Sequence, residues 1–340
     1  MRAARLHVLG QPLRIDEIAV PEVARDEVLI RIAGAGVCHS DLHIRTGEFP
    51  LPPGFELPLT LGHENAGYVE AVGPDVKSVE RGDAVAVWGG RGCGSCRICR
   101  QGDEQCCNMA LWVAAGGYSE FMHVPSERFL VKLDGLDPIA AAPLADAGLT
   151  PYRAIKKTLP HLYPGATIAV LGVGGLGHMA LQILKALAPS TRIIAADVSI
   201  DRLEAATKLG ASDVVDARGD AAGEIMRLTG GEGAQAVIDL VGSDATLRTA
   251  AAAAGRKGII VLVGLGGGTL PYSFLGVRAE CTVTCSYWGS YNEFQEVLAL
   301  AHSGSIRPTI RRYSLDSVNE ALDALERGQI HGRAVITPDR

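Results

Sequence analysis

The stretch Thr167-Ile-Ala-Val-Leu-Gly172-Val-Gly-Gly-Leu-Gly177 decides the fold, because a short apolar run leads directly into a G-x-G-x-x-G motif. Apolar residues then recur at helical spacing as far as Leu187. A strand, a glycine-rich turn and a helix therefore follow in the order that a dinucleotide-binding βαβ unit requires. Taken alone, the motif also fits a glycine-rich turn that binds nothing.

Each glycine of this motif has its own expected role. Gly172 permits the tight turn, Gly174 lets a pyrophosphate approach the backbone, and Gly177 lets the helix pack on the strand. The N-terminus of the helix then offers free N–H groups and the positive end of its dipole to phosphates. The residues expected to contact a cofactor in this loop are Gly172, Gly174, Gly175, Leu176 and Gly177.

Asp197 ends the next apolar run and indicates which cofactor binds. A carboxylate at this position accepts hydrogen bonds from both hydroxyl groups of the adenosine ribose. It also repels a 2′-phosphate, so the sequence predicts NAD rather than NADP. Arg202 lies five residues further on, too far to offset that repulsion, and is expected to stack on the adenine.

The surrounding sequence predicts an α/β protein with a doubly wound parallel sheet. Before about Leu133 the chain is rich in short strands broken by Gly and Pro. Helices are expected at 251–254, 291–302 and 315–326, and a last strand at 334–337. The predicted strands of the parallel sheet are 167–171, 192–197, 213–216, 236–241, 258–263 and 281–287.

Length and composition exclude several classes of protein. The 340 residues suit two domains, at roughly 150 residues per domain. The net charge of −6 and the absence of a basic run argue against nucleic acid as a partner. No apolar run reaches the ~20 residues of a membrane span, and the N-terminus lacks the apolar region of a signal peptide. We therefore expect a cytoplasmic protein without a membrane partner.

Four of the eight cysteines form a local pattern typical of a structural zinc site. They are Cys93, Cys96, Cys99 and Cys107. An iron–sulfur cluster is the competing interpretation, although the x3-C-P continuation of ferredoxin sequences is missing. Cys106 is expected to be a spare thiol, and Cys281 and Cys285 are expected to be small core residues of a strand.

A second, dispersed set of metal donors lies upstream. The segment Cys38-His-Ser-Asp-Leu-His43 supplies several candidate ligands, and Gly62-His63-Glu64 supplies two more. Either histidine alone is more typical of a surface or core position. The combination of both segments with the cysteine cluster and the nucleotide motif makes the chain recognisable.

The chain resembles the zinc-dependent medium-chain alcohol dehydrogenases over essentially its full length. It is most similar to the bacterial NAD-dependent, broad-range enzymes that act on secondary and aryl alcohols. The resemblance is carried by GVCHSDLH at 36–43, LTLGHENAG at 59–67, CGSCRICRQGDEQCC at 93–107, PLADAGLTPY at 143–152 and GVGGLG at 172–177.

The resemblance implies a domain organisation. Residues 1–148 and 288–340 would form a GroES-like, β-rich catalytic domain that holds two zinc ions, one catalytic and one structural. Residues 149–287 would form the NAD-binding Rossmann domain. The family habit implies a homotetramer, with a dimer as the alternative, and the expected strand 281–287 offers an edge for pairing.

The resemblance also implies the ligands of the catalytic zinc. Cys38 and His63 match two of them, and Asp146 stands where many relatives have a cysteine. Cysteine and aspartate carry the same formal charge, so the ligand set keeps a charge of −2. Glu64 would be a transient ligand or a hydrogen-bonding residue that orients the site.

Further residues match the family's proton relay and cofactor contacts. Ser40 and His43 would carry the alcohol proton away from the zinc site, and Asp41 would orient a zinc ligand. Thr150 and Val263 would lie beside the nicotinamide. Arg333 would reach the pyrophosphate, with an ordinary surface arginine as the alternative.

Aromatic residues near these motifs indicate an apolar substrate pocket. The expected wall residues are Trp88, Trp112, Trp288 and Phe55. We therefore expect hydride transfer between NAD and a neutral, apolar or aryl, primary or secondary alcohol, giving an aldehyde or ketone. The alternatives are a polyol dehydrogenase of the same superfamily, a non-catalytic nucleotide-binding protein and an iron–sulfur redox protein.

Overall fold

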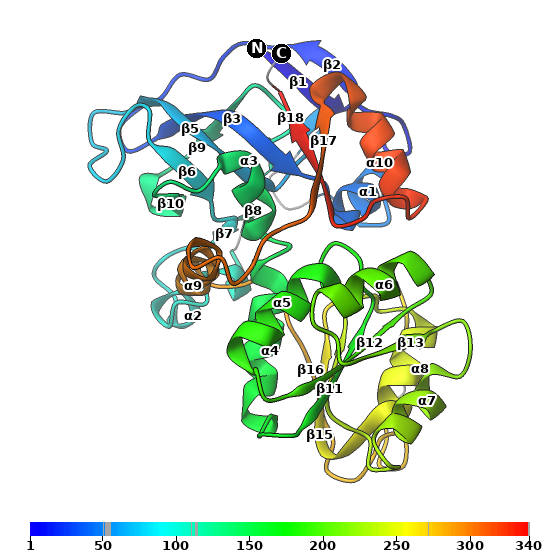
Figure 1. Ribbon diagram of the computed structural model, residues 1–340. Helices are drawn as coiled ribbons and strands as arrows, with labels where there is room; N and C mark the ends of the chain where they lie inside the picture. Colours follow the sequence, from blue (N-terminus) through cyan, green and yellow to red (C-terminus); the bar gives the residue numbers. More distant parts are fainter. Residues whose placement is uncertain (50, 52–55, 110, 113–114, 271, 339–340) are drawn as a thin grey trace. The chain divides into compact units, whose positions relative to one another are not determined.

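The chain divides into two compact units, seen in the computed structural model of Figure 1. The structure describes residues 1–49, 51, 56–109, 111–112, 115–270 and 272–338. The first unit comprises Met1–Leu149, Gly289–His302 and Pro308–Arg340. The second comprises Thr150–Trp288 and Ser303–Arg307. The carboxyl-terminal part of the chain thus returns to the first unit.

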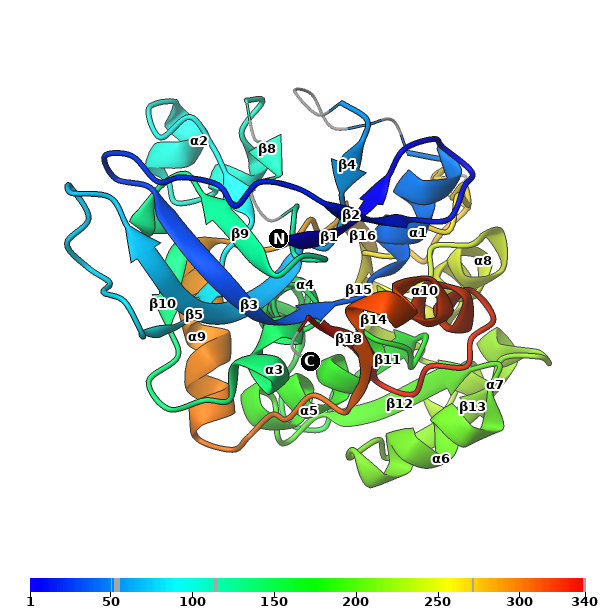
Figure 2. The same ribbon diagram turned by 90° about the horizontal axis from the view of Figure 1, so that it is seen from above.

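The first unit is built around a mixed sheet with the order β10-β6-β5-β3-β18-β17, and β9 also pairs with β3. Figure 2 shows β3 beside β5. Two smaller sheets, β2-β1-β4 and β7-β8, complete the unit. The strands are β1 Arg2–Leu6, β2 Arg14–Glu17, β3 Val28–Gly36, β4 Leu59–Thr60, β5 Glu64–Val72, β6 Ala84–Val87, β7 Gly90–Arg91, β8 Leu111–Trp112, β9 Phe121–Val124, β10 Leu130–Lys132, β17 Ile310–Ser314 and β18 Arg333–Thr337.

The central strand β3 determines where the candidate site forms. Its carboxyl end pairs Gly36 with Glu64 of β5 on one side and with Val335 of β18 on the other. The helices of this unit are α1 His39–Thr46, α2 Arg97–Arg100, α3 Pro138–Ala141, α9 Tyr291–His302 and α10 Val318–Glu326. Because α1 follows β3 directly, the carboxyl end of β3, the amino end of α1 and the amino end of β5 all lie near Gly36.

The second unit is a parallel sheet with the order β13-β12-β11-β14-β15-β16. The strand order reverses between β11 and β14, which is the switch point at which doubly wound sheets bind ligands. The strands are β11 Thr167–Leu171, β12 Arg192–Asp197, β13 Asp213–Asp216, β14 Ala234–Asp239, β15 Ala254–Leu262 and β16 Thr282–Cys285. The helices are α4 Leu149–Thr158, which begins at the unit boundary, α5 Gly177–Leu187, α6 Ile200–Lys208, α7 Ala221–Leu228 and α8 Asp244–Ala253.

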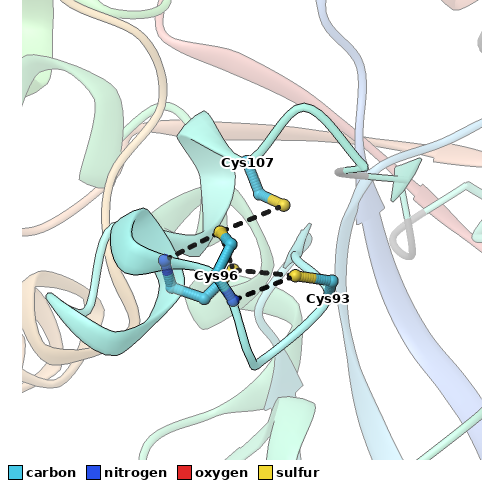
Figure 3. A group of neighbouring side chains, drawn as sticks. Cys93, Cys96 and Cys107 are labelled. Atoms are coloured by element: carbon cyan, nitrogen blue, oxygen red, sulfur yellow. Dashed lines mark hydrogen bonds between the residues drawn. The ribbon is translucent and has the colours of Figure 1, made fainter.

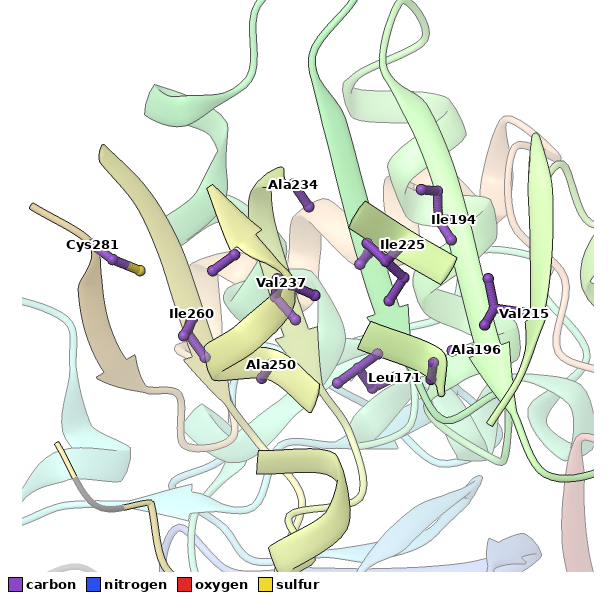
Figure 4. Close-up of a cluster of buried hydrophobic side chains, with 14 residues drawn as sticks. Leu171, Ile194, Ala196, Val215, Ile225, Ala234, Val237, Ala250, Ile260 and Cys281 are labelled. Atoms are coloured by element: carbon purple, nitrogen blue, oxygen red, sulfur yellow. The ribbon is translucent and has the colours of Figure 1, made fainter. Parts of the chain in front are cut away.

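A continuous apolar core joins this sheet to α7 and α8 (Figure 4). Ile194, Val237 and Ile260 on three strands are buried together with Ile225 of α7 and Ala250 of α8. Burial of such side chains stabilises the fold by roughly 1.5–3 kcal/mol for each large aliphatic residue. The glycine-rich turn therefore follows a strand, β11, whose side chains are packed into this core.

Sequence reasoning placed several boundaries wrongly. β14 ends at Asp239 rather than at 241, because the Asp239 carboxylate caps the N–H groups of Val241 and Gly242. Ala254 is the first residue of β15 and not the end of a helix. Cys285 is exposed on β16, so the expectation of a core residue was wrong there, whereas Cys281 is buried.

Among the described residues, no helix combines the length and the apolar character that a membrane crossing requires.

Candidate metal centre and nucleotide site

The four cysteines predicted to hold a metal ion converge in the first unit. Their sulfur atoms lie 3.9 Å apart for Cys93 and Cys99, 3.5 Å for Cys96 and Cys99, and 3.8 Å for Cys96 and Cys107. Figure 3 shows three of these sulfur atoms turned toward a common centre. A tetrahedron with zinc–sulfur distances of about 2.3 Å has edges of roughly 3.8 Å, so this geometry fits Zn²⁺.

Local hydrogen bonds favour the thiolate form of Cys93, whereas burial and the neighbouring thiols raise the pKa of Cys99 to about 12. The hydroxyl group of Ser95 and the backbone N–H of Cys96 point at the sulfur of Cys93 and lower its pKa to about 6. The thiolate is the form of cysteine that binds metal. Cys106, by contrast, is exposed and lies outside the group of four.

The second set of donors comes from three separate parts of the first unit. Ligand atoms of Cys38, His63, Glu64 and Asp146 all lie within 4.8 Å of one another. Oδ2 of Asp146 is 3.5 Å from the sulfur of Cys38 and 3.6 Å from Nε2 of His63. A zinc ion with donors at about 2.0–2.3 Å requires separations of roughly 3.3–3.8 Å, which these three atoms match.

Local structure explains how these donors are positioned. Cys38 is the N-cap of α1, and its backbone N–H donates to Oδ2 of Asp41 at the third helical position. His63 stands immediately before β5, and Asp146 follows the short 3-10 helix Ala142–Ala145. The Asp146 backbone has φ −137° and ψ −59°, so it lies at the end of that helix rather than within it.

The His63 ring lies between two carboxylates. Its Nδ1 is 3.4 Å from Oδ1 of Asp41, so Nε2 faces Asp146. Burial alone would lower the pKa of His63, but Asp41 and then Asp146 outweigh that effect and raise it well above its usual value. A carboxylate on the far nitrogen of a histidine ligand is the common arrangement in zinc sites, because it fixes the ring and its tautomer.

Glu64 is completely buried and forms an ion pair with Arg333. Nε of Arg333 donates to one oxygen at 3.0 Å, and Nη2 contacts the other. Burial raises the pKa of Glu64, and the Arg333 guanidinium opposes that rise. Arg333 is itself only 1% exposed and lies 3.5 Å from Asp146, so the surface-arginine alternative is wrong. Its contact with a pyrophosphate stays a prediction.

The nucleotide motif of the second unit has the backbone geometry that its glycines require. Gly172 has φ +92°, and a Cβ atom there would lie 2.6 Å from the Val241 side chain. A Cβ on Gly177 would lie 2.1 Å from the carbonyl oxygen of Gly172. A Cβ atom on Gly174 would have no neighbour closer than Nη1 of Arg202 at 4.0 Å, so the backbone there is open to a ligand. The residues present therefore fit a dinucleotide.

Asp197 lies at the end of β12 with both carboxylate oxygens turned toward backbone N–H groups. Oδ2 accepts from Val173 at 2.7 Å, and Oδ1 accepts from Ser199 at 2.9 Å. Each carboxylate oxygen can accept a further hydrogen bond, so the ribose hydroxyl groups still have acceptors. Arg202 approaches Asp197 with Nη1 at 3.9 Å from Oδ2, so it lies closer to this carboxylate than its sequence separation of five residues suggested. Its stacking on the adenine stays a prediction.

The expected relay residues lie on α1. The Ser40 hydroxyl oxygen is 3.3 Å from the sulfur of Cys38. His43, one helical turn later, is half-buried, stacks on Phe49 and pairs its Nδ1 with Oε2 of Glu48 at 2.5 Å. Sequence reasoning missed this carboxylate, because Glu48 lies beyond the end of the helix and outside every motif.

The structure gives the expected pocket and nicotinamide residues different surroundings. Trp88 is 2% exposed, packs against Phe129 and Tyr291, and donates its indole N–H to the Gly289 carbonyl, which is the packing of a core residue. The expected roles of Trp88 and of the other residues stay predictions. Trp288 is buried with φ +47°, Trp112 is in β8 and Thr150 is in α4. Val263 follows β15, and its backbone N–H donates to the carbonyl oxygen of Asp239. Phe55 lies outside the described residues.

Comparison with known proteins identifies the family. The model of the alcohol dehydrogenase GroES-like domain matches residues 24–135, and the model of the zinc-binding dehydrogenases matches residues 175–303. An NAD-dependent alcohol dehydrogenase of Sulfurisphaera tokodaii is 41% identical over 350 residues, which cover 99% of this chain and 100% of the relative. The chain therefore belongs to the zinc-binding alcohol dehydrogenase family.

Two further relatives bear on the function. The crystal structure of the alcohol dehydrogenase from the archaeon Aeropyrum pernix superposes with a TM-score of 0.93 at 41% identity and covers 99% of this chain and 100% of that chain. A D-arabinose 1-dehydrogenase (NADP(+)) of Saccharolobus solfataricus is 40% identical over 343 residues, covering 99% of this chain and 97% of the relative.

Proposed function

We propose that this protein is a zinc-dependent oxidoreductase that transfers hydride between a neutral alcohol and NAD, giving an aldehyde or a ketone. The observation that carries the proposal is the convergence of Cys38, His63 and Asp146 in one unit, with a nucleotide motif in the other. We assign the first unit, drawn from the sequence as 1–148 and 288–340, to catalysis. We assign the second, 149–287, to NAD binding.

The proposed division of labour gives each donor set one task. Cys93, Cys96, Cys99 and Cys107 would hold a structural zinc ion, because four thiolates close a tetrahedron. Cys38, His63 and Asp146 would hold a catalytic one, because three protein ligands leave a position for substrate. When bound, such a zinc ion supplies Lewis acidity that polarises an oxygen, and NAD accepts the hydride.

The side chains around the catalytic donors would orient the substrate and move its proton. Ser40 lies beside Cys38 and would receive the hydroxyl proton, which His43 would then hold at its ring and release to water with Glu48 beside it. Glu64 would cancel the positive charge of Arg333, so that the pair adds no net charge to the site.

Replacement of His43 by glutamine should lower the turnover rate at neutral pH by about tenfold. This is less than the 10²–10⁴-fold effect of a direct general base, because water can still accept the proton. The affinity for NAD should stay nearly unchanged, and added imidazole should restore part of the rate. The measurement is a pH–rate profile with and without imidazole.

His123 supplies a matched control for this variant, because it is a half-exposed histidine of the first unit that pairs with Glu27 at 3.2 Å. We expect His123→Gln to leave the profile as it is. A profile of His43→Gln that matches the wild type would make His43 a bystander.

A panel of substrates tests the proposed function. Primary, secondary and aryl alcohols should each be oxidised with NAD, which the absorbance of the reduced nicotinamide reports, and metal analysis should find two zinc ions per chain. The similarity to a D-arabinose 1-dehydrogenase favours sugar oxidation as the second candidate function. Turnover of pentoses but not of alcohols would replace the first candidate by the second.

The assembly and location of the protein are also proposed. β16 is an edge strand of the parallel sheet, and Tyr272, Phe274 and Leu275 are exposed near it in the sequence, which supports a homotetramer or a dimer. Light scattering in solution tests this, and a stable monomer would contradict it. None of the eight cysteines, all of which lie among the described residues, forms a disulfide, which supports a reducing, cytoplasmic compartment.

A further inference from the structure

A buried hydrogen-bonded chain leads from Tyr118 to the donors of the first unit. The Tyr118 hydroxyl group donates to Oδ2 of Asp41 at 2.8 Å, and Oδ1 of Asp41 faces Nδ1 of His63 at 3.4 Å. Tyr118 is 0% exposed, Asp41 1% and His63 5%. Tyr118 is thus a polar side chain in the core whose hydroxyl group reaches His63 through a single carboxylate.

Asp41 is held by donors from every side. Oδ2 accepts the backbone N–H of Cys38 at 3.0 Å in addition to the Tyr118 hydroxyl group. Oδ1 accepts the backbone N–H of Gly62 at 3.3 Å in addition to its contact with His63. The two backbone donors belong to the segments that carry Cys38 and His63, so the carboxylate links both ligands.

Tyr118 is itself fixed against the segment that carries His63. Its backbone N–H donates to the Leu61 carbonyl at 3.0 Å, and the neighbouring Gly117 N–H donates to the Gly62 carbonyl at 3.0 Å. Gly62 has φ +91°, and a Cβ atom there would lie 2.6 Å from a ring carbon of Tyr118. The ring therefore packs directly on the backbone that precedes His63.

We propose that Tyr118 is a positioning residue of the metal centre: its hydroxyl group fixes the Asp41 carboxylate, which holds the His63 ring with Nε2 toward Cys38 and Asp146. This inference rests on the proposed role of Cys38, His63 and Asp146 as zinc ligands. Without the hydroxyl group, Asp41 loses one of its two side-chain partners in a place that water does not reach. The carboxylate and the ring can then turn.

Tyr118→Phe removes one oxygen atom and keeps the ring, so it tests the hydroxyl group alone. The measurement is the release of zinc from the complete protein to a chromogenic chelator. Release should show two kinetic phases, and Cys38→Ser and Cys96→Ser should each lack one of them. We expect Tyr118→Phe to accelerate the phase missing in Cys38→Ser by up to about tenfold. This is at or below the lower end of the 10- to 100-fold effect of removing a direct partner of a metal ligand, because Tyr118 acts on His63 through Asp41.

The chain supplies two controls for this experiment. The phase that belongs to the cysteine loop should keep its rate. Tyr313 is a buried tyrosine of the same unit, and among the described residues its hydroxyl group has no hydrogen-bond partner, so Tyr313→Phe should leave both phases unchanged. Asp41→Asn retains an acceptor for Tyr118 but weakens the direct contact with His63, and it should accelerate the same phase at least as much as Tyr118→Phe does.

Three outcomes would overturn the proposal. In the first, Tyr118→Phe lowers the unfolding temperature and leaves zinc release unchanged, which indicates a purely structural hydroxyl group. In the second, both phases accelerate alike. In the third, the wild type has no phase that depends on Cys38. Because none of these readouts uses turnover, a protein that oxidises no alcohol would contradict the proposed function and leave this inference standing.

Discussion

Replacement of Cys38 by serine should reduce alcohol oxidation by more than about 100-fold and leave the fold intact. Loss of an outer-shell partner alone costs about 10- to 100-fold, and Cys38 is proposed as a ligand itself. Its sulfur lies 3.5 Å from Oδ2 of Asp146 in a buried site, where a serine hydroxyl group offers neither the charge nor the softness of a thiolate. The zinc content found by metal analysis should fall from two ions per chain to one.

Cys96→Ser is the informative counterpart to Cys38→Ser. It should also remove one zinc ion, but it should lower the midpoint of thermal unfolding, because a structural metal contributes to the free energy of folding. Cys106→Ser is the matched control: Cys106 is exposed, lies within the same loop and is outside the group of four, so metal content and stability should stay as they are. The division into a catalytic and a structural site is wrong if Cys38→Ser and Cys96→Ser behave alike.

Asp197→Ala should weaken NAD binding by about 10- to 100-fold and leave NADP binding unchanged or improved. A hydrogen bond to a charged group is worth about 1.5–3 kcal/mol, and each 1.4 kcal/mol is a factor of ten. The substitution also removes the charge that repels a 2′-phosphate, so the two cofactors respond in opposite directions. Val198→Arg, next to Asp197, should move the preference further toward NADP.

The structure adds a second consequence to this substitution. Oδ2 of Asp197 accepts the N–H of Val173 inside the glycine-rich turn, so Asp197→Ala also loosens the turn. Asp197→Asn keeps the shape of the side chain and one acceptor oxygen. It therefore separates the effect of the negative charge from the effect of holding the turn in place. Asp201→Ala removes an exposed carboxylate on the neighbouring helix and serves as the control. Equal use of both cofactors by the wild type would mean that Asp197 does not lie at the ribose.

The parallel sheet could be predicted well because its strands are short apolar runs bounded by turn residues. β11, β12 and β13 begin and end where the sequence indicates. The predicted bounds of β14 and β15 differ from those in the structure, because alanine carries little information about whether a segment is a strand or a helix. Ala254 follows a run of alanines in α8, and only its pairing with Ala234 makes it part of a strand.

The metal donors could be named from the sequence, but their supports could not. Cys38, His63 and the cysteine loop lie in recognisable motifs, whereas Tyr118 lies 77 residues from Asp41 and belongs to none. The sequence did offer one signal for such a support. Asp41 stands at the third position of a helix whose N-cap is Cys38, so its carboxylate is expected beside that ligand. The role of Trp88 as a pocket wall, which the resemblance implies, stays a prediction; the structure shows its ring buried against Phe129 and Tyr291.

The spacing of the two donor sets along the chain has a consequence for the order of assembly. Cys93 and Cys107 are 14 residues apart, whereas Cys38 and Asp146 are separated by 108. By loop-closure entropy alone, the second set costs about 2 kcal/mol more to bring together. The cysteine loop can thus close on a metal ion while most of the chain is still being synthesised.

The other centre is completed last. Glu64 meets its counter-ion only when β18 has been made, because Arg333 follows it by 269 residues. Every proposed zinc ligand precedes β18 in the chain, whereas the cation that pairs with the buried Glu64 carboxylate lies within it. The charge balance of this centre therefore depends on the docking of β18 onto β3, because β18 carries the only cation shown to pair with Glu64 among the described residues.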